Sequence, residues 1–241
     1  MHLFYHPDIT SAGLCTLDAE ESRHAVRVMR MREGDELHVT DGRGHLYTCR
    51  IAVADDRACT VETIAVATPH ATRPSLHLAV APTKNPSRME WLVEKAVEVG
   101  VDEITLLQCD HSERTFLKTD RLQRLAVSAM KQSLHLTLPA IHPVVVLTEW
   151  LHDSVGTPHI QRLIAHCEAD RPRTPLATAL PAGRDTLVLI GPEGDFDPQE
   201  VEAALKAGFV PVTLGESRLR TETAALMAVA TMHVLGIAKS N

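Results

Sequence analysis

Three loops of this chain hold residue types suited to binding or chemistry, and each follows an apolar run. The sequence GPEG occupies residues 191–194 after LVLI, HCE occupies 166–168 after RLIA, and GESRLRTET occupies 215–223 after FVPVTL. Glycines at two of these points allow the backbone to approach a ligand closely. Glycine and proline also form simple strand-to-helix turns, so a plain corner is the alternative for residues 191–194. For the third loop the alternative is an elaborate helix cap, with Thr221 as the cap residue.

Apolar periodicity places these loops among alternating strands and helices. The expected strands are residues 76–82, 103–108, 162–168, 186–190 and 209–215, and the expected helices are 85–100, 120–134, 197–208 and 221–236. This alternation implies an α/β fold with a parallel sheet that is covered on both faces. Ligands of such sheets lie beyond the carboxyl ends of the strands, where the three loops begin.

Two helix starts carry capping signals. Residues 197–200 (DPQE) combine a cap residue, proline at the first helical position and glutamate at the third. Two arrangements are open for the helix at 85–100: Asn85 caps it directly before Pro86, or Ser87 and Glu90 form a capping box.

Residues 1–70 have the short alternating runs and tight turns of a small β domain. One helix is expected over about residues 19–31, turns at 41–44 and 55–56, and a linker at 67–74 (ATPHATRP). Within ten residues that contain no acid lie Arg23, Arg27, Arg30 and Arg32. Helical spacing would place the first three on one face. Such a patch suits an RNA backbone, and a solvated helix face is the plainer alternative.

Composition argues against several other classes of protein. The net charge of −7 disfavours a nucleic-acid partner unless cations gather locally. The five cysteines form no CxxC pair and the fourteen histidines form no HExxH motif, so no metal site is expected. The glycine fingerprint of nicotinamide-dependent oxidoreductases is absent. No apolar run reaches the ~20 residues that cross a bilayer, and no signal peptide is recognisable, so a soluble cytoplasmic protein without a membrane partner is expected.

Several segments together resemble one protein family across essentially the whole chain. GPEGDF at 191–196, LGESRLRTETAALMAVA at 214–230 and MEWLVEKAVEVGVDEI at 89–104 are similar to the RsmE family of 16S ribosomal RNA uridine-N3 methyltransferases, in the SPOUT superfamily. ESRHAVRVMRMREGDELHVTDGRG at 21–44 resembles the N-terminal PUA-like RNA-binding domain of that family.

The resemblance implies two domains: a small PUA-like β-barrel over residues 1–70 that binds RNA, and a SPOUT-type trefoil-knotted domain with a parallel sheet over residues 74–241. It implies that S-adenosylmethionine binds at the knot, and that a homodimer packs through the final helices. The implied reaction is methylation of N3 of a specific uridine in 16S rRNA of the small ribosomal subunit. Two alternatives remain, a methyltransferase for another RNA such as tRNA and a non-catalytic RNA-binding ribosome-assembly factor.

The resemblance also implies roles for residues by position. The cofactor would be held by His166, Ile190, Gly191, Gly194, Leu214, Gly215, Leu219 and Thr221, with Glu168 as a looser candidate. As a separate hypothesis about the mechanism, we expect Arg220, at the mouth of that pocket, to stabilise the anion that develops on the uracil, and Glu193 to accept the proton or lie near the sulfonium. RNA would contact Arg23, Arg27, Arg30, Arg32 and Gln132. Two positions depart from the family pattern: Asp195 replaces the second glycine of a GPEGG sequence, and Ser217-Arg218 replaces an Arg-Ile pair.

Overall fold

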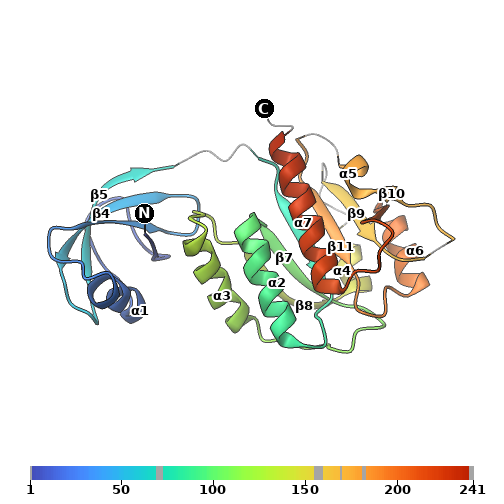
Figure 1. The fold of residues 1–241 in the computed structure, drawn as a ribbon, viewed down its shortest axis with the longest axis horizontal. Coiled ribbons are helices and arrows are strands. Elements are labelled where there is room, and N and C mark those ends of the chain that lie inside the picture. Colours follow the sequence, from blue (N-terminus) through green and yellow to red (C-terminus); the bar gives the residue numbers. More distant parts are fainter. Residues whose placement is uncertain (1, 69–72, 155–159, 169, 181–182, 239–241) are drawn as a thin grey trace. The chain divides into compact units, whose positions relative to one another are not determined.

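The computed structural model describes residues 2–68, 73–154, 160–168, 170–180 and 183–238. The chain forms two compact units (Figure 1): unit 1 comprises Met1–Ala71 and Val127–Leu138, and unit 2 comprises Thr72–Ala126 and Pro139–Asn241. Each unit has its own hydrophobic core. The expected linker at 67–74 contains the boundary between Ala71 of unit 1 and Thr72 of unit 2. Its residues 69–72 lie outside the described residues.

Unit 1 is built on a five-stranded sheet in the order β1-β3-β4-β5-β2. Its strands are β1 (Leu3–Tyr5), β2 (Leu14–Thr16), β3 (Glu36–Thr40), β4 (Leu46–Val53) and β5 (Thr60–Ala67). β1 runs parallel to β3, and the other neighbouring strands are antiparallel. The expected turns at 41–44 and 55–56 connect β3 to β4 and β4 to β5, so both are confirmed.

The helix expected near residues 19–31 is shorter and changes its type. α1 (Ala19–Arg23) starts at Asp18, whose carboxylate accepts the N–H groups of Glu20 and Glu21, and η1 (His24–Val28) continues it as a π-helix. Arg30 follows the helix with a φ of 57°, in the left-handed region. The expected helical face of Arg23, Arg27 and Arg30 is therefore wrong, because π-helical turns change the spacing and Arg30 lies beyond the helix.

A segment distant in sequence completes unit 1. It consists of the end of α3 (Thr119–Gln132) and the residues that follow. The Leu136 carbonyl accepts bonds from the Thr40 hydroxyl and the Gly44 N–H, both 2.9 Å long, and Lys131 forms an ion pair with Glu21. Because these bonds tie the segment to the β3–β4 turn, residues 127–138 fold with the N-terminal sheet.

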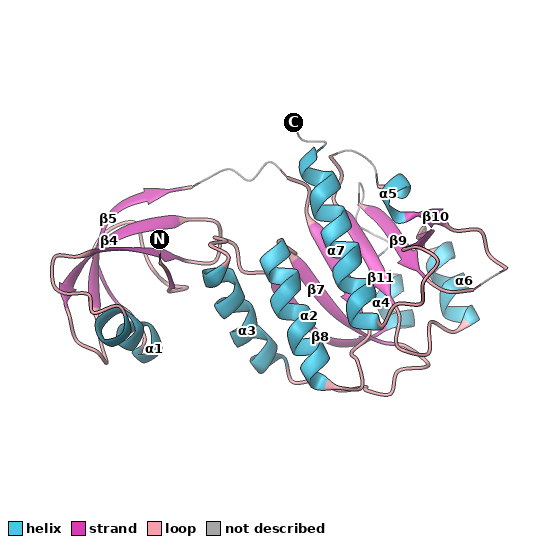
Figure 2. Ribbon diagram, viewed as in Figure 1, coloured by secondary structure: helices cyan, strands magenta, loops and turns pink. Residues whose placement is uncertain are grey.

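Unit 2 is built on a seven-stranded sheet in the order β10-β12-β9-β11-β6-β7-β8, and all neighbouring strands are parallel (Figure 2). The strands are β6 (Leu76–Val80), β7 (Glu103–Gln108), β8 (Ala140–Val146), β9 (Gln161–Ala165), β10 (Thr174–Pro175), β11 (Thr186–Ile190) and β12 (Val210–Thr213). The five strands expected in this region are confirmed: β7 and β11 have the expected bounds, and β6, β9 and β12 end earlier than expected. β8 and β10 were not expected from the sequence.

The helices of unit 2 are α2 (Pro86–Val99), α4 (Leu147–Ser154), α5 (Leu176–Ala179), α6 (Pro198–Lys206) and α7 (Thr221–Ala238), together with the first part of α3. α2 and α6 begin where the capping signals place them, whereas α4 and α5 were not expected from the sequence. The Asn85 side chain accepts the Ser87 N–H at 3.0 Å, so Asn85 is the cap of α2. Asp197 and Glu200 form the expected capping box of α6. No helix in the described chain is long and apolar enough to cross a membrane.

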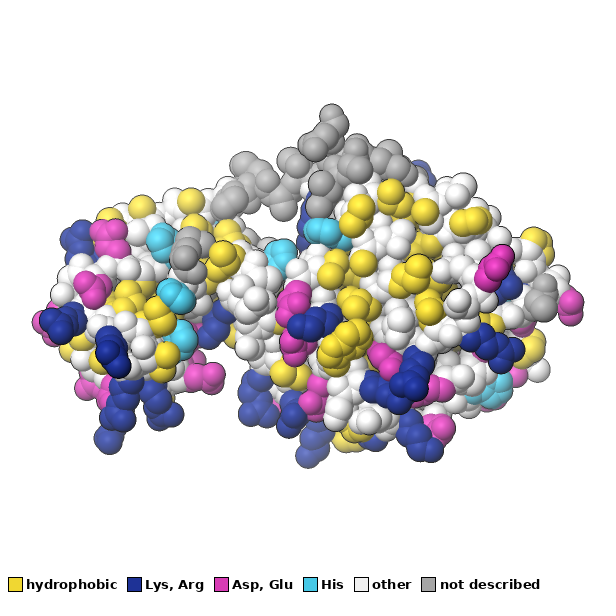
Figure 3. All heavy atoms as spheres, viewed as in Figure 1, with side chains coloured by type: hydrophobic (Ala, Val, Ile, Leu, Met, Phe, Trp, Pro, Cys, Tyr) yellow, Lys and Arg dark blue, Asp and Glu magenta, His cyan; other side chains and the backbone are white. Residues whose placement is uncertain are grey.

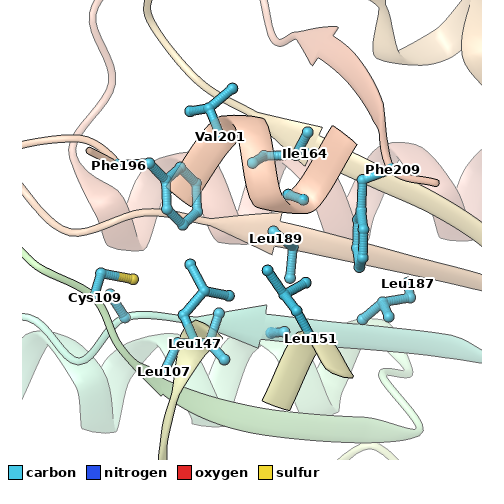
Figure 4. Close-up of a cluster of buried hydrophobic side chains, with 13 residues drawn as sticks. Leu107, Cys109, Leu147, Leu151, Ile164, Leu187, Leu189, Phe196, Val201 and Phe209 are labelled. Atoms are coloured by element: carbon cyan, nitrogen blue, oxygen red, sulfur yellow. The ribbon is translucent and has the colours of Figure 1, made fainter. Parts of the chain in front are cut away.

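Both faces of the parallel sheet are buried. On one face, Leu187 and Leu189 of β11, Ile164 of β9 and Leu107 of β7 pack against α4 and α6 (Figure 4). Alternate residues of a strand point to opposite faces, so Val188, which lies between Leu187 and Leu189, faces the other side, where α7 contacts β6, β11 and α2. This double cover holds the carboxyl ends of the central strands in fixed positions.

His77, a largely buried histidine, lies within unit 2. The Nε2 atom of His77 on β6 lies 2.9 Å from the Thr105 hydroxyl, and its ring meets Trp150 edge-on with centroids 6.0 Å apart. Burial lowers the pKa of His77 to about 4; Glu103 opposes the fall and His142 adds to it. The folded protein therefore holds this imidazole neutral at a pH where the unfolded chain protonates it.

We expect the stability of unit 2 to fall as the pH drops from 6.5 to about 4. In that window His77 is protonated in the unfolded chain but not in the folded protein, so protonation favours unfolding. The difference in pKa corresponds to roughly 3 kcal/mol of unfolding free energy. Urea unfolding is followed by the fluorescence of Trp91 and Trp150, both in unit 2. His77→Gln should flatten the pH slope, whereas His142→Gln, which removes only a smaller contribution to the pKa shift of His77, should reduce the slope less. Equal slopes in His77→Gln and wild type would contradict this.

Candidate active site

The three loops singled out in the sequence leave one edge of the sheet. β11 pairs in parallel with β9, and β9 pairs in parallel with β12, so residues 166–168, 191–197 and 214–220 all follow carboxyl ends of adjacent strands. β6 lies on the other side of β11, and its following loop reaches the same edge. This is where parallel α/β sheets place their ligands.

The start of α7 is bonded to the end of β11. The Thr221 hydroxyl donates to the Gly191 carbonyl at 3.2 Å, and Thr221 is only 4% exposed. A Cβ on Gly191 would lie 3.0–3.2 Å from Phe196, so only glycine fits there without displacing its neighbour. Thr221 is the first residue of α7 and Arg220 precedes the helix, so the Thr221 hydroxyl ties the helix start to the residue that follows β11.

Asp195 joins two of the loops. Its φ of 65° lies in the left-handed region, where glycine is the usual residue. Its carboxylate accepts the Cys167 N–H at 2.7 Å, and its own N–H donates to the Pro192 carbonyl at 3.0 Å. His111 Nδ1 lies 3.1 Å from the Asp195 carbonyl oxygen. The Asp195 side chain therefore clasps the loop after β11 to the loop after β9.

The loop after β9 contains buried polar groups. His166 is 3% exposed, its Nδ1 accepts the Glu168 N–H at 3.2 Å, and its carbonyl accepts Arg173 at 2.7 Å. Burial lowers the pKa of His166, while Glu168 and Asp195 oppose that effect, so the ring is neutral with its proton on Nε2. Within the described residues, His166 Nε2 and Glu168 Oε1 are buried without a hydrogen-bond partner.

A cleft of about 690 Å³ opens beside the loops after β9 and β12. Two of the predicted cofactor-binding residues, Leu214 and Gly215, line the cleft. Ser217 and Arg218 line it as well. Gly215 has a φ of 123° and no atom within 4 Å of the place where a Cβ would be, so its backbone is open to a ligand. The other lining residues are Cys167, Arg171, Arg173, Pro175, Leu176, Ala177, Thr213, Glu216, Met227 and Thr231.

Residues 171–177 of that lining were not predicted. The segment reads as a polar loop with prolines, and only its position after β9 in the sheet brings it to the cleft. Met227 was also missed, because it lies inside α7, where apolar residues occupy nearly all sides of the helix.

The remaining predicted cofactor residues lie at the same edge but do not line the cleft. Ile190 ends β11 and is buried, and Leu219 is exposed in the loop before α7. Gly194 is exposed, and a Cβ there would lie 3.1 Å from His111. The predicted proton acceptor, Glu193, is exposed and accepts the Lys84 N–H at 3.0 Å. Arg220 directly precedes α7, with its carbonyl accepting the Ala224 N–H at 2.8 Å and its side chain exposed.

The predicted RNA contacts all lie in unit 1. Arg23, Arg27, Arg30 and Arg32 are exposed, and Arg27 forms an ion pair with Asp56. Gln132 is the last residue of α3 and belongs to the segment that completes unit 1. It is therefore in a different compact unit from the cleft.

One group of side chains in the described chain brings possible metal ligands together. Asp110, His111 and Asp197 each offer an atom within 4.8 Å of the others. Asp110 and His111 are exposed, and Asp197 already accepts the Gln199 N–H as the cap of α6. We assign no ion to this group.

Comparison with known proteins matches the architecture to one enzyme class. Residues 71–233 match the family described as an RNA methyltransferase domain, and residues 17–64 match an RNA methyltransferase PUA domain. The chain therefore belongs to the RNA methyltransferase family. The matched region, residues 71–233, includes the parallel sheet, the clasped loops and the residues that line the cleft.

Three relatives illustrate the match. A probable rRNA-methyltransferase from Porphyromonas gingivalis is 45% identical, with a TM-score of 0.91 and 99% of each chain covered. Ribosomal RNA small subunit methyltransferase E from Neisseria gonorrhoeae, solved with S-adenosyl methionine, is 29% identical, with a TM-score of 0.80 and 98% of each chain covered. The methyltransferase of that name from Mycobacterium bovis is 29% identical over 97% of this chain and 91% of its own length.

We expect substitutions of Asp195 to separate its side-chain bond from its backbone conformation. Asp195→Ala loses the bond to Cys167 and keeps a φ that alanine tolerates poorly, so unfolding free energy should fall by about 1–3 kcal/mol. Asp195→Gly should lose less because glycine accepts that φ, and Asp195→Asn should stay near wild type. Urea unfolding measures all three, and an Asp195→Ala variant as stable as wild type would contradict the clasp.

Proposed function

We propose that this protein transfers the methyl group of S-adenosylmethionine to N3 of a specific uridine in 16S rRNA of the small ribosomal subunit. The observation that carries the proposal is the cleft at the carboxyl edge, bordered by the clasped loops of an RNA methyltransferase domain. The Neisseria relative, whose fold is similar over 98% of this chain, was solved with S-adenosyl methionine bound.

The cleft fits the chemistry of this cofactor. Leu214, Leu176 and Met227 offer apolar surface for a purine, and the open backbone at Gly215 offers polar groups beside it. The bond from the Thr221 hydroxyl to the Gly191 carbonyl holds the start of α7 at the end of β11, directly after Ile190. When bound, the cofactor supplies an activated methyl group on a positively charged sulfur.

The chain's own residues supply alignment and electrostatics. Uridine N3 must lose its proton, and negative charge then spreads toward the uracil oxygens. Arg220 is exposed directly before α7, and in our proposal its guanidinium stabilises that charge. Glu193 accepts the proton, with one carboxylate oxygen held by the Lys84 N–H.

Unit 1 is the RNA-binding domain in this proposal, with residues 1–70 as a PUA-like domain and residues 74–241 as the methyltransferase domain. The match of residues 17–64 to an RNA methyltransferase PUA domain supports this role. The proposal includes closure of its sheet as a barrel around the core that contains Phe4, Val39 and Val61. Because the proposed substrate is ribosomal, the proposal includes a cytoplasmic reaction.

The proposed fold of unit 2 is a trefoil knot. After β12 the chain must pass the end of β9 to reach Gly191 at the end of β11, because those strands are ordered β12-β9-β11. In a SPOUT-type knot this return threads through an earlier loop. Experimental density traced through residues 160–238 would show whether the return passes through that loop or outside it.

A homodimer through α7 completes the proposal. Met227 and Val234, seven residues apart on this helix, are 43% and 62% exposed. Figure 3 shows hydrophobic side chains gathered on the face of unit 2 that carries α2 and α7. Sedimentation velocity measures the mass directly, and a Val234→Glu variant should shift the protein toward monomer.

The test of the proposed function is methyl transfer from radiolabelled S-adenosylmethionine to small ribosomal subunits from cells that lack this protein. Mass spectrometry of the product should find a single N3-methyluridine in 16S rRNA. Methylation of tRNA instead would keep the enzyme class and replace the substrate. Cofactor binding without transfer to any RNA would favour a non-catalytic assembly factor.

We expect Arg220→Ala to lower kcat by about 10²–10³-fold, because it removes a donor to charge that develops only in the transition state. The affinity for S-adenosylmethionine should stay within about threefold of wild type, since the side chain is assigned to the uracil. Arg218→Ala is the comparison: Arg218 lines the cleft, so this variant should weaken cofactor binding more than it lowers kcat. Near-normal turnover by Arg220→Ala at saturating substrates would remove Arg220 from the chemistry.

We expect Arg30→Glu to weaken binding of 16S rRNA and to reduce the slope of log affinity against log salt by about 1. Arg30 is exposed on unit 1 and, unlike Arg27, takes part in no ion pair with a described residue. Lys206→Glu on α6 changes the net charge equally and should leave RNA affinity unchanged. A salt titration measures both variants, and identical slopes for Arg30→Glu and wild type would exclude the patch.

A further inference from the structure

Phe116 differs from the other phenylalanines of the chain. Three of the four, Phe4, Phe196 and Phe209, are at most 3% exposed, whereas Phe116 is 68% exposed. Single exposed apolar side chains are common on protein surfaces, so the exposure alone assigns nothing. The surroundings of the ring determine its role.

Cations surround Phe116 in the chain. Between Arg114 and Arg124 there are four cations, Arg114, Lys118, Arg121 and Arg124, and one acid, Asp120, although the whole chain has a net charge of −7. Lys118 and Arg124 are exposed and form no ion pair with the residues that the structure describes. An exposed aromatic ring among cations is the usual surface that binds single-stranded nucleic acid, since the ring stacks on a base and the cations attract phosphates.

The loop that carries Phe116 is anchored at its base. It links β7 to α3, and its Asp110 N–H donates to Glu200 at 2.9 Å. The Arg114 guanidinium donates to the Lys84 carbonyl at 2.9 Å, and the Lys84 ammonium lies 2.6 Å from Glu113. A ring held on an anchored loop loses little conformational freedom when it binds.

The same anchors connect the loop to the candidate active site. Lys84, which accepts the Arg114 bond through its carbonyl, donates its N–H to Glu193 at 3.0 Å. His111 lies against Gly194 and Asp195 of the turn after β11. Phe116 is therefore presented by a loop that adjoins the turn holding the proposed proton acceptor.

We propose that Phe116 stacks on an unpaired base of the RNA substrate, while Lys118 and Arg124 contact neighbouring phosphates. This inference rests on the proposed function and deepens it. N3 lies on the Watson–Crick edge of uridine, so the methylated base and its contacts must be out of a duplex. The ring face tolerates any base, and sequence selection then comes from other contacts.

The test compares RNA affinities by fluorescence anisotropy on full-length protein. The probes are a labelled single-stranded RNA of about 12 nucleotides and a duplex of the same sequence. Phe116→Ala should weaken single-strand binding about 5- to 100-fold and leave duplex binding unchanged. Phe116→Trp should restore the affinity because it keeps the stacking face. Val210→Ala is the control and should bind like wild type. It trims an exposed apolar side chain at the amino end of β12, the end away from the candidate active site.

Three results would overturn the inference. Single-strand affinity of Phe116→Ala equal to wild type would remove the ring from RNA binding. Equal loss on both probes without rescue by tryptophan would point to a structural defect. A Phe116→Ala protein that becomes monomeric in sedimentation would assign the ring to contact with a second copy of the chain.

Methyl transfer to small subunits is measured in parallel, so that failure of this inference and failure of the proposed function are distinguished. If wild type transfers the methyl group and Phe116→Ala binds RNA as wild type does, this inference alone is rejected. If wild type neither binds RNA nor transfers the methyl group, the proposed function is rejected too.

Discussion

The hydrogen bond from Thr221 to the Gly191 carbonyl fixes the arrangement on which the site depends. It fastens the first turn of the last helix to the end of a central strand, so the segment between β12 and α7 has to cross the carboxyl edge of the sheet. The close approach requires glycine at 191, because a Cβ would meet Phe196. Leu214 and Gly215 reach the cleft because the crossing segment carries them there.

Asp195 adds a second constraint of a different kind. A non-glycine residue with φ of 65° is unfavourable in itself, and the bond to the Cys167 N–H offsets that cost. The clasp is electrostatic as well as geometric. Burial lowers the pKa of His166, and the Asp195 carboxylate beside the loop after β9 opposes that fall. The Asp195 side chain thus holds the loop after β11 against the loop after β9.

Periodicity and capping chemistry predicted most of unit 2, because parallel strands buried on both faces and helices with strong caps leave a local signal. Asp197 and Glu200 are the clearest case. β8 was missed because Pro143 interrupts its apolar pattern. Features set by distant partners were also beyond local prediction: Arg27 pairs with Asp56, and residues 127–138 fold with unit 1 through bonds such as that from Thr40 to Leu136. The cleft lining at 171–177 depends on sheet order, which no local pattern encodes.

The central claim is that the loops after β9, β11 and β12 form one cofactor site. Hydrogen–deuterium exchange with and without S-adenosylmethionine tests it most directly, because it reports each loop separately on the intact protein. We predict that the cofactor slows exchange in residues 166–174, 191–197 and 214–220 together. The protection of all three loops should depend on cofactor concentration in the same way. Protection confined to one of these loops, or centred on the loop after β7 instead, would contradict the claim.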